Sequence, residues 1–147
     1  MKEIKKIKTK SSKGFSLVEL LVVVAILGIL SAVGLVSYNG YISGTKEKSA
    51  KNVMQQISLA QTEEYSNAGS YFTQSTGTCT PTDITSNEIE DELFDGGDQI
   101  ATEAGYNICI ASTGAANYNI FASEISGNTP CTLTLSRNGN FTRGDDC

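Results

Sequence analysis

An apolar run from residue 15 to residue 36 constrains this chain more than any other feature. It reads FSLVELLVVVAILGILSAVGLV, which is 22 residues with one charge, Glu19. As an α-helix it would extend about 33 Å, enough to cross a hydrocarbon core of about 30 Å. We therefore expect a transmembrane helix over residues 15–36.

The segment before this run is strongly basic. Residues 1–14 contain one acid, Glu3, and six lysines, at positions 2, 5, 6, 8, 10 and 13. Positive charge stays on the cytoplasmic side of a membrane, so the chain beyond residue 36 is expected outside. A signal peptide cleaved within residues 31–34 and an uncleaved signal anchor are two competing interpretations. Glu19 argues against both, because a carboxylate in a membrane segment is costly and is by default functional.

The remainder of the chain is acidic. The sequence carries a net charge of −5, and removing the +5 of residues 1–14 leaves −10. A surface of this charge repels phosphate backbones, so nucleic acid is not an expected partner. Arg137 and Arg143 leave open a weak contact of an assembled fibre with DNA, against the alternative of ordinary surface charge.

Histidine is absent, and the cysteines are widely spaced. Without histidine the chain lacks the commonest general base and the commonest neutral metal ligand. We expect no enzyme, no metal and no cofactor; an enzyme or receptor head on a membrane anchor is the remote alternative. Four cysteines without a C-x-x-C pair, in an exported chain, predict disulfides with three possible pairings among Cys79, Cys109, Cys131 and Cys147.

The helix is predicted to continue beyond the apolar run to residue 68. Gly69 is a suitable stop, and helical spacing marks one apolar face formed by Ala50, Val53, Met54, Ile57 and Ala60. Lysines 46, 48 and 51 fall on other faces. They form either a solvated surface or a contact with an acidic neighbour.

Residues 106–111, 118–123 and 132–136 are predicted strands of a small antiparallel sheet, within an α+β fold. Asn138-Gly139 predicts a hairpin to a last strand at Phe141-Thr142, and residues 70–105 form the long connection from helix to sheet. The acidic residues 88–98 suit calcium by composition but fail the EF-hand spacing. A solvated acidic helix and turn is the competing interpretation.

The heptapeptide Lys13-Gly14-Phe15-Ser16-Leu17-Val18-Glu19 resembles the class III leader junction of type IV pilins and type II secretion pseudopilins, and the resemblance extends to Tyr38. It implies a leader over residues 1–14, cleavage by prepilin peptidase between Gly14 and Phe15, and N-methylation of Phe15. It also implies a role in assembly for Phe15 and Glu19. The ammonium of one subunit would pair with the carboxylate of the next, each relieving the other's burial.

The resemblance also implies the "ladle" fold, with a helix over residues 15–68 and a head over residues 69–147. It favours a Cys131–Cys147 bond closing a C-terminal loop, which leaves Cys79 with Cys109. Each bond could add roughly 3 to 4 kcal/mol. The loop is either purely structural or also adhesive. Where the family usually has a helix-kinking proline, this chain has Val36, and Gly34, Gly40 and Gly44 would weaken the helix instead.

The implied function is that of a structural pilus subunit. It would polymerise as a homo-oligomer into a helical surface filament for adhesion, twitching motility or DNA uptake. Its partners would be prepilin peptidase and an inner-membrane assembly platform. It would reside in the inner membrane before assembly and in the extracellular pilus (fimbrium) afterwards. The alternative is a type II secretion pseudopilin, a class that usually lacks a disulfide-closed C-terminus.

Overall fold

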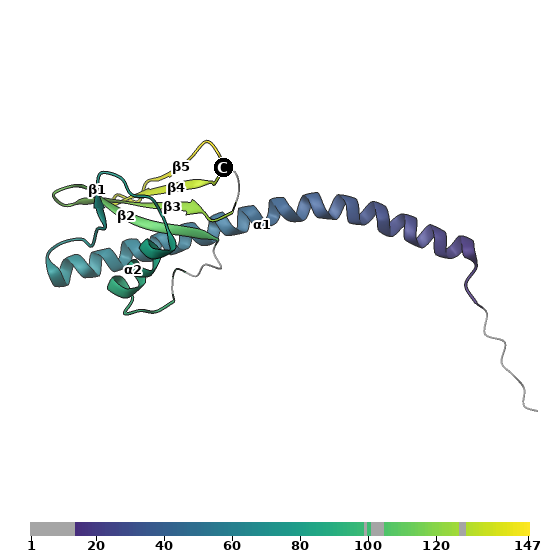
Figure 1. Ribbon diagram of the computed structural model, residues 1–147, viewed down its shortest axis with the longest axis horizontal. Coiled ribbons are helices and arrows are strands. Elements are labelled where there is room, and N and C mark those ends of the chain that lie inside the picture. Colours follow the sequence, from purple (N-terminus) through teal and green to yellow (C-terminus); the bar gives the residue numbers. More distant parts are fainter. Residues whose placement is uncertain (1–13, 99, 101–104, 127–128) are drawn as a thin grey trace, which may run out of the picture. The chain divides into compact units, whose positions relative to one another are not determined.

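A computed structural model describes residues 14–98, 100, 105–126 and 129–147. The predicted leader, except for Gly14, lies outside the described residues. The chain divides into two units, Met1–Tyr41 and Ile42–Cys147. Helix α1, Leu17–Ala68, contributes residues to both units (Figure 1).

Helix α1 is 52 residues long and ends where the sequence predicts. Gly69 follows it with φ of 75°, and its backbone N–H donates to the carbonyl of Tyr65 at 2.9 Å. A left-handed residue of this kind closes the last turn of a helix at little cost only when it is glycine. The helix also passes without interruption through residue 36, where the family's proline is missing.

The second unit holds one five-stranded sheet in the order β1-β2-β3-β4-β5. The strands are β1, Ser75–Thr76; β2, Tyr106–Gly114; β3, Asn117–Glu124; β4, Thr132–Ser136; and β5, Phe141–Arg143. Pairing from β2 to β5 is antiparallel, as predicted. The sheet as a whole is mixed, because β1 pairs in parallel with β2. Two residues are too few to show an alternating pattern in the sequence.

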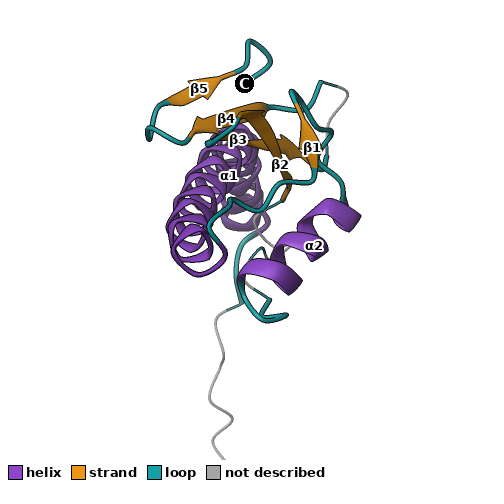
Figure 2. Ribbon diagram, turned by 90° about the vertical axis from the view of Figure 1, so that its left-hand side faces the viewer, coloured by secondary structure: helices purple, strands orange, loops and turns teal. Residues whose placement is uncertain are grey.

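The core lies between one face of the sheet and one face of α1 (Figure 2). Ala50, Met54 and Ile57 of the predicted apolar face are fully buried, whereas Val53 and Ala60 are partly buried. The sheet supplies cross-strand rows such as Ile110, Ile120 and Leu135, which the register places side by side. Alternate residues of β2, β3 and β4 therefore face the helix.

Gln61 is a buried polar residue in this core, one helical turn beyond Ile57. Its side-chain amide donates to the carbonyl of Phe72 at 2.6 Å, and its oxygen accepts from the Phe72 backbone N–H at 2.9 Å. Both polar groups of Phe72 are thus satisfied by one side chain. The bond pair fixes the chain where it leaves α1 and turns toward the sheet.

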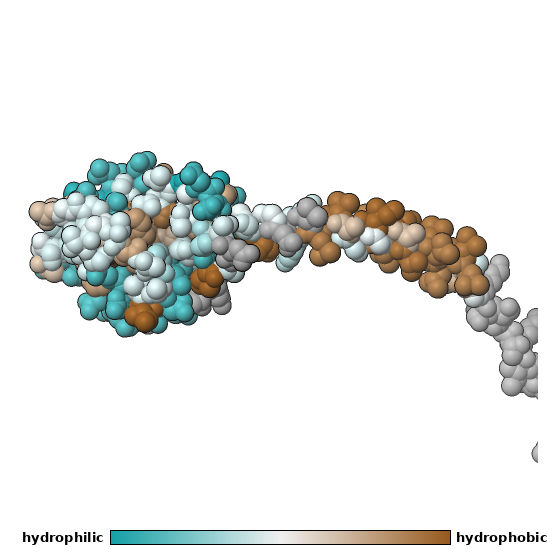
Figure 3. All heavy atoms as spheres, turned by 45° about the horizontal axis from the view of Figure 1, so that its top comes forward, coloured by the Kyte–Doolittle hydropathy of each residue, from teal (hydrophilic) through white to brown (hydrophobic). Residues whose placement is uncertain are grey.

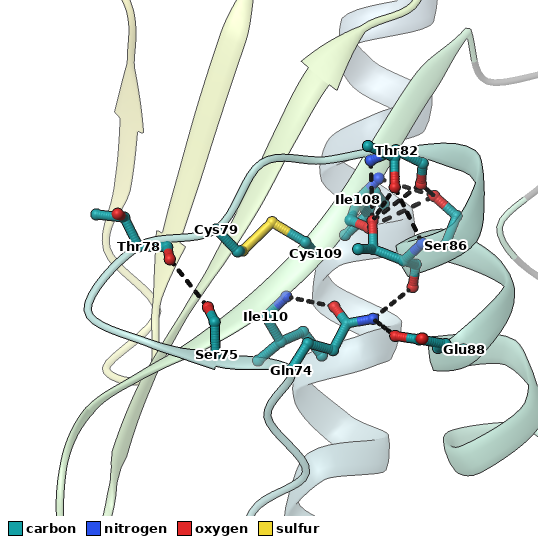
Figure 4. The surroundings of a disulfide bond; sticks show 11 residues. Gln74, Ser75, Thr78, Cys79, Thr82, Ser86, Glu88, Ile108, Cys109 and Ile110 are labelled. Atoms are coloured by element: carbon teal, nitrogen blue, oxygen red, sulfur yellow. Dashed lines mark hydrogen bonds between the residues drawn. A yellow bond between two sulfur atoms is a disulfide. The ribbon is translucent and has the colours of Figure 1, made fainter.

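Helix α2, Asp83–Leu93, covers the edge of β2. Thr82 and Thr85 form a capping box at its start. Ser86 accepts from the Ile108 N–H at 2.9 Å, and Thr85 donates to the Ile108 carbonyl at 2.8 Å (Figure 4). These side chains occupy the backbone groups that an open strand edge would present to another chain.

The acidic residues 88–98 form the second half of α2 and the turn after it, which is the helix-and-turn interpretation. Glu88 accepts from Gln74 at 2.7 Å, and Glu90 accepts from the Ile100 N–H at 2.7 Å. Within the described residues, no group of three or more acidic or cysteine side chains is arranged to hold a metal ion. Two of these carboxylates instead hold neighbouring segments in place.

Replacing Gln61 with leucine tests the link between α1 and the turn. Gln61→Leu keeps the side-chain volume but leaves the N–H and carbonyl of Phe72 without partners, which should lower the free energy of unfolding by about 2 kcal/mol. Chemical denaturation of the detergent-solubilised chain, followed by the near-ultraviolet tyrosine signal, measures it. Gln56→Leu, at an exposed position of the same helix, is the matched control. Equal stability of the two variants would show that the hydrogen bonds of Gln61 to Phe72 do not stabilise the fold.

Candidate assembly site

Ser16 and Glu19 cap the start of α1. The backbone N–H of Ser16 donates to Glu19 Oε2 at 2.8 Å, and the N–H of Glu19 donates to Ser16 Oγ at 3.2 Å. The two reciprocal bonds make a capping box, which satisfies donors that the first turn of a helix leaves free. The S-x-x-E spacing is the sequence signature of such a box, whereas the resemblance implied for Glu19 only a partner in another subunit.

The capping box holds the carboxylate next to the peptide bond where the resemblance places the cut. Phe15 directly precedes the N–H that Glu19 accepts from, and its side chain is 86% exposed. A cut after Gly14 would turn the Phe15 nitrogen into an ammonium one residue from that N–H. The geometry thus places an acid at the end of the helix where a new positive charge would form.

The first part of α1 offers an apolar surface that the described chain does not cover. Every described side chain from residue 15 to residue 35 is exposed, and these residues include an 18-residue window of high hydropathy (Figure 3). The segment is long and apolar enough to cross a membrane. An exposed apolar surface of this extent in water would indicate an interaction site.

A second feature is the C-terminal loop. Cys131 and Cys147 form a disulfide with a sequence separation of 16 residues, the pairing that the resemblance implied. Within the loop, Arg143 donates to the carbonyl oxygen of Cys147 and also lies 3.2 Å from Glu47 of α1. The loop is therefore closed covalently and held to the helix by an ion pair.

Glu47 is the centre of this attachment. It accepts from Lys51 at 2.8 Å in addition to facing Arg143. The hydrogen bond from Lys51 and the nearby charges of Lys51, Arg143 and Lys48 lower the pKa of Glu47 against the opposing effect of partial burial. Lys51 also lies over the ring of Phe141 in β5, 5.9 Å from its centroid. The helix, β5 and the C-terminal loop thus share one cluster of charges.

The other disulfide, Cys79–Cys109, joins the connection before α2 to the middle of β2 (Figure 4). Cys109 is fully buried, and strand alternation places it on the face of β2 opposite to Ile108 and Ile110, which pack in the core. The Gln74 side chain also accepts from the Ile110 N–H, and the Gln74 backbone N–H donates to the Ile110 carbonyl. The connection is therefore attached to β2 at two neighbouring residues, Cys109 and Ile110.

The two arginines considered for DNA contact are both engaged within the unit Ile42–Cys147. Arg143 pairs with Glu47, and Arg137 donates from Nε to the hydroxyl of Tyr71 at 3.0 Å. The guanidinium of Arg137 also stacks over the Tyr71 ring, with 5.4 Å from Cζ to the centroid. Among the lysines, Lys51 is paired, whereas Lys48 is exposed and forms no ion pair within the described residues.

Comparison with known proteins identifies the family. The model of the prokaryotic N-terminal methylation motif matches residues 9–35, which include Gly14, Phe15 and Glu19. A fimbrial protein of Neisseria meningitidis serogroup A is 31% identical over 138 residues, covering 91% of this chain and 81% of that protein. A type IV major pilin, PilE1, of Neisseria gonorrhoeae is 33% identical over 93 residues, 61% of this chain and 52% of that pilin.

The chain belongs to the type IV pilin family. A shorter similarity, 40% identity over 57 residues, links this pilin to the fimbrial protein EcpC of Eikenella corrodens and covers 39% of this chain and 37% of that protein. No solved structure matches it. The long helix and the small sheet fit the α+β fold expected of the family.

Removing the Ser16 hydroxyl should loosen the first turn of the pilin helix. Ser16→Ala removes the acceptor for the Glu19 N–H, at a cost of about 1 kcal/mol, so the Glu19 amide should exchange its hydrogen about fivefold faster. Hydrogen exchange measured by NMR in micelles detects this. Ser16→Thr, which keeps a hydroxyl at the cap, should restore slow exchange. Unchanged exchange in Ser16→Ala would show that the capping box does not form.

The attachment of the C-terminal loop should depend on pH through Glu47. Its pKa is lower in the folded chain than its ordinary value of about 4.5, so the pair stabilises the fold above that pH and is lost as pH falls through the folded pKa. Glu47→Gln should reduce the free energy of unfolding at pH 7 by about 0.5 to 1 kcal/mol. The difference from the unmodified chain should vanish in strong acid. Glu63→Gln, at an exposed site of α1, is the control and should show a smaller effect.

Proposed function

We propose that this pilin is a structural subunit of a type IV pilus, polymerised into a helical filament on a bacterial cell surface. The match of residues 9–35 to the methylation motif, together with similarity to a fimbrial protein over 91% of the chain, carries this proposal. The apolar first part of α1 supports it, because it needs first a membrane and then other copies to cover it. The role proposed is assembly, not catalysis.

Processing would begin with prepilin peptidase cutting between Gly14 and Phe15. Gly14 precedes the first turn of α1, and apart from its chain neighbours no atom of the described residues lies within 4 Å of the place where a side chain would begin. A peptide bond in this open, non-helical position is suited to entry into a protease. N-methylation of Phe15 would then keep the positive charge of the new amino group while removing one hydrogen-bond donor.

Assembly would exchange the partner of Glu19. Before assembly, the carboxylate accepts from the N–H of Ser16 in its own chain. In the filament, the Phe15 ammonium of a neighbouring copy would face it in an apolar surrounding, where an unpaired charge of either sign is strongly destabilising. This requirement would fix the stagger between neighbours, since only one displacement brings the two charges together.

The partners proposed are other copies of the chain, prepilin peptidase and the assembly platform of the inner membrane. The pilin would be anchored in the inner membrane before assembly and would belong to the extracellular pilus (fimbrium) afterwards. Adhesion, twitching motility and DNA uptake are the activities such a filament could serve. The engagement of Arg137 and Arg143 within the unit Ile42–Cys147 supports at most weak DNA contact. The disulfide-closed C-terminus supports a pilus subunit over a type II secretion pseudopilin.

Intact mass spectrometry of sheared surface filaments tests the proposal. The expected mass begins at Phe15, carries one added methyl group and lacks four hydrogens, because both disulfides are formed. Glu19→Gln keeps a side-chain oxygen for the cap but has no charge, so its filament yield should fall at least about tenfold while the chain is still cut.

The membrane fraction of the same cells supplies the control. There, Glu19→Gln should accumulate as a chain that begins at Phe15, which separates processing from assembly. An uncut chain in cells with active peptidase would contradict the proposed processing. A normal filament yield from Glu19→Gln would contradict the charge pairing.

A further inference from the structure

The head carries an apolar groove between α1 and the β4–β5 hairpin. Its volume is about 370 Å³, and it is lined by Gln55, Ser58, Leu59, Leu135, Gly139 and Phe141. Leu59 stands at this groove with 73% of its surface exposed. A large apolar side chain beside an apolar groove indicates a place where another surface can dock.

Two lysines of α1 lie outside the lining of the groove but close to it along the chain, Lys48 and the Glu47-paired Lys51. Lys48, Asn52, Gln55 and Leu59 follow one another at spacings of four, three and four residues, so they form one exposed stripe along α1. Lys48 on this stripe forms no ion pair within the described residues. Lys51 lies over Phe141, which is one of the lining residues. A surface that fits here should therefore present an apolar side chain next to negative charge.

Helix α2 presents such a surface. Ile84 is a large apolar residue of this helix and is 72% exposed. Asp91, two helical turns further along, is exposed as well. The helix contains five acids and no basic residue. Figures 1 and 2 both show α2 at the opposite side of the sheet from β5. The acidic surface of α2 with Ile84 and the groove with Leu59 and Phe141 thus lie on opposite sides of the sheet.

We infer that Ile84 of one copy of the chain occupies the groove beside Leu59 and Phe141 of a second copy. Two α2 surfaces meeting face to face would bring like charges together, which disfavours a symmetric pair. Two different surfaces on opposite sides instead make a heterologous contact, which repeats from copy to copy and produces an open filament. The inference rests on the proposed function, because it names the surfaces through which subunits of the filament meet.

A photo-reactive residue at position 84 tests the contact directly. We would replace Ile84 with p-benzoylphenylalanine in the full chain, allow the cells to assemble filaments, irradiate them and map the cross-links by mass spectrometry. The expected product is a dimer that joins position 84 of one copy to a peptide containing Leu59 or Phe141 of another. The same residue placed at Ile125, an exposed site outside both surfaces, should not form this dimer. Cross-links from position 84 to other peptides, or to another protein, would overturn the inference.

A charge exchange tests the same contact without a bulky probe. Lys48→Glu and Asp91→Lys should each lower the yield of sheared filaments several-fold, and the double variant should restore most of the yield. Ile125→Ser is the matched control and should assemble like the unmodified chain. If each single variant lowers the filament yield and the double variant does not restore it, the contact between Lys48 and Asp91 of neighbouring copies is overturned. Failure of the unmodified chain to form filaments would instead contradict the proposed function.

Discussion

The exposed apolar surface of the first part of α1 is the main physical constraint on this pilin. Its side chains from Leu17 to Leu35 are exposed in the described chain. Water is therefore a poor environment for them, and a membrane, or other copies of the segment in the proposed filament, would cover them. Glu19 is the one charged residue of this segment. Its bond to the Ser16 N–H gives the carboxylate a partner inside its own chain.

The head stabilises the second half of the helix by different means. Burial of Ala50, Met54 and Ile57 against the sheet provides the apolar contact, and Gln61 ties the end of the helix to the turn that follows. At one side of the sheet, α2 side chains occupy the backbone groups of Ile108. At the other side, the closed C-terminal loop is attached through Arg143 and Glu47. Both margins of the sheet are thus held by side-chain contacts.

Much of this arrangement could be predicted from the sequence because its physical causes are local. Alternation of apolar and polar residues marked β4 at its observed bounds, and Asn138-Gly139 marked the last hairpin, where Gly139 has φ of 81°. Other features depend on contacts between distant segments. The two residues of β1 carry no pattern, and Thr82 opens α2 with a threonine three residues later instead of the usual glutamate or glutamine. The burial of Gln61 could not be predicted either, since a polar residue on the apolar face has no local signature.

A cryo-EM reconstruction of sheared filaments would show whether other copies bury the apolar part of α1 and give Glu19 its second partner. We expect the segments from residue 15 to residue 35 to pack against one another at the centre of the filament. We also expect the Glu19 carboxylate within salt-bridge distance of the Phe15 nitrogen of a neighbouring copy. Segments exposed at the filament surface, or a Glu19 carboxylate bound only to its own Ser16, would contradict these expectations.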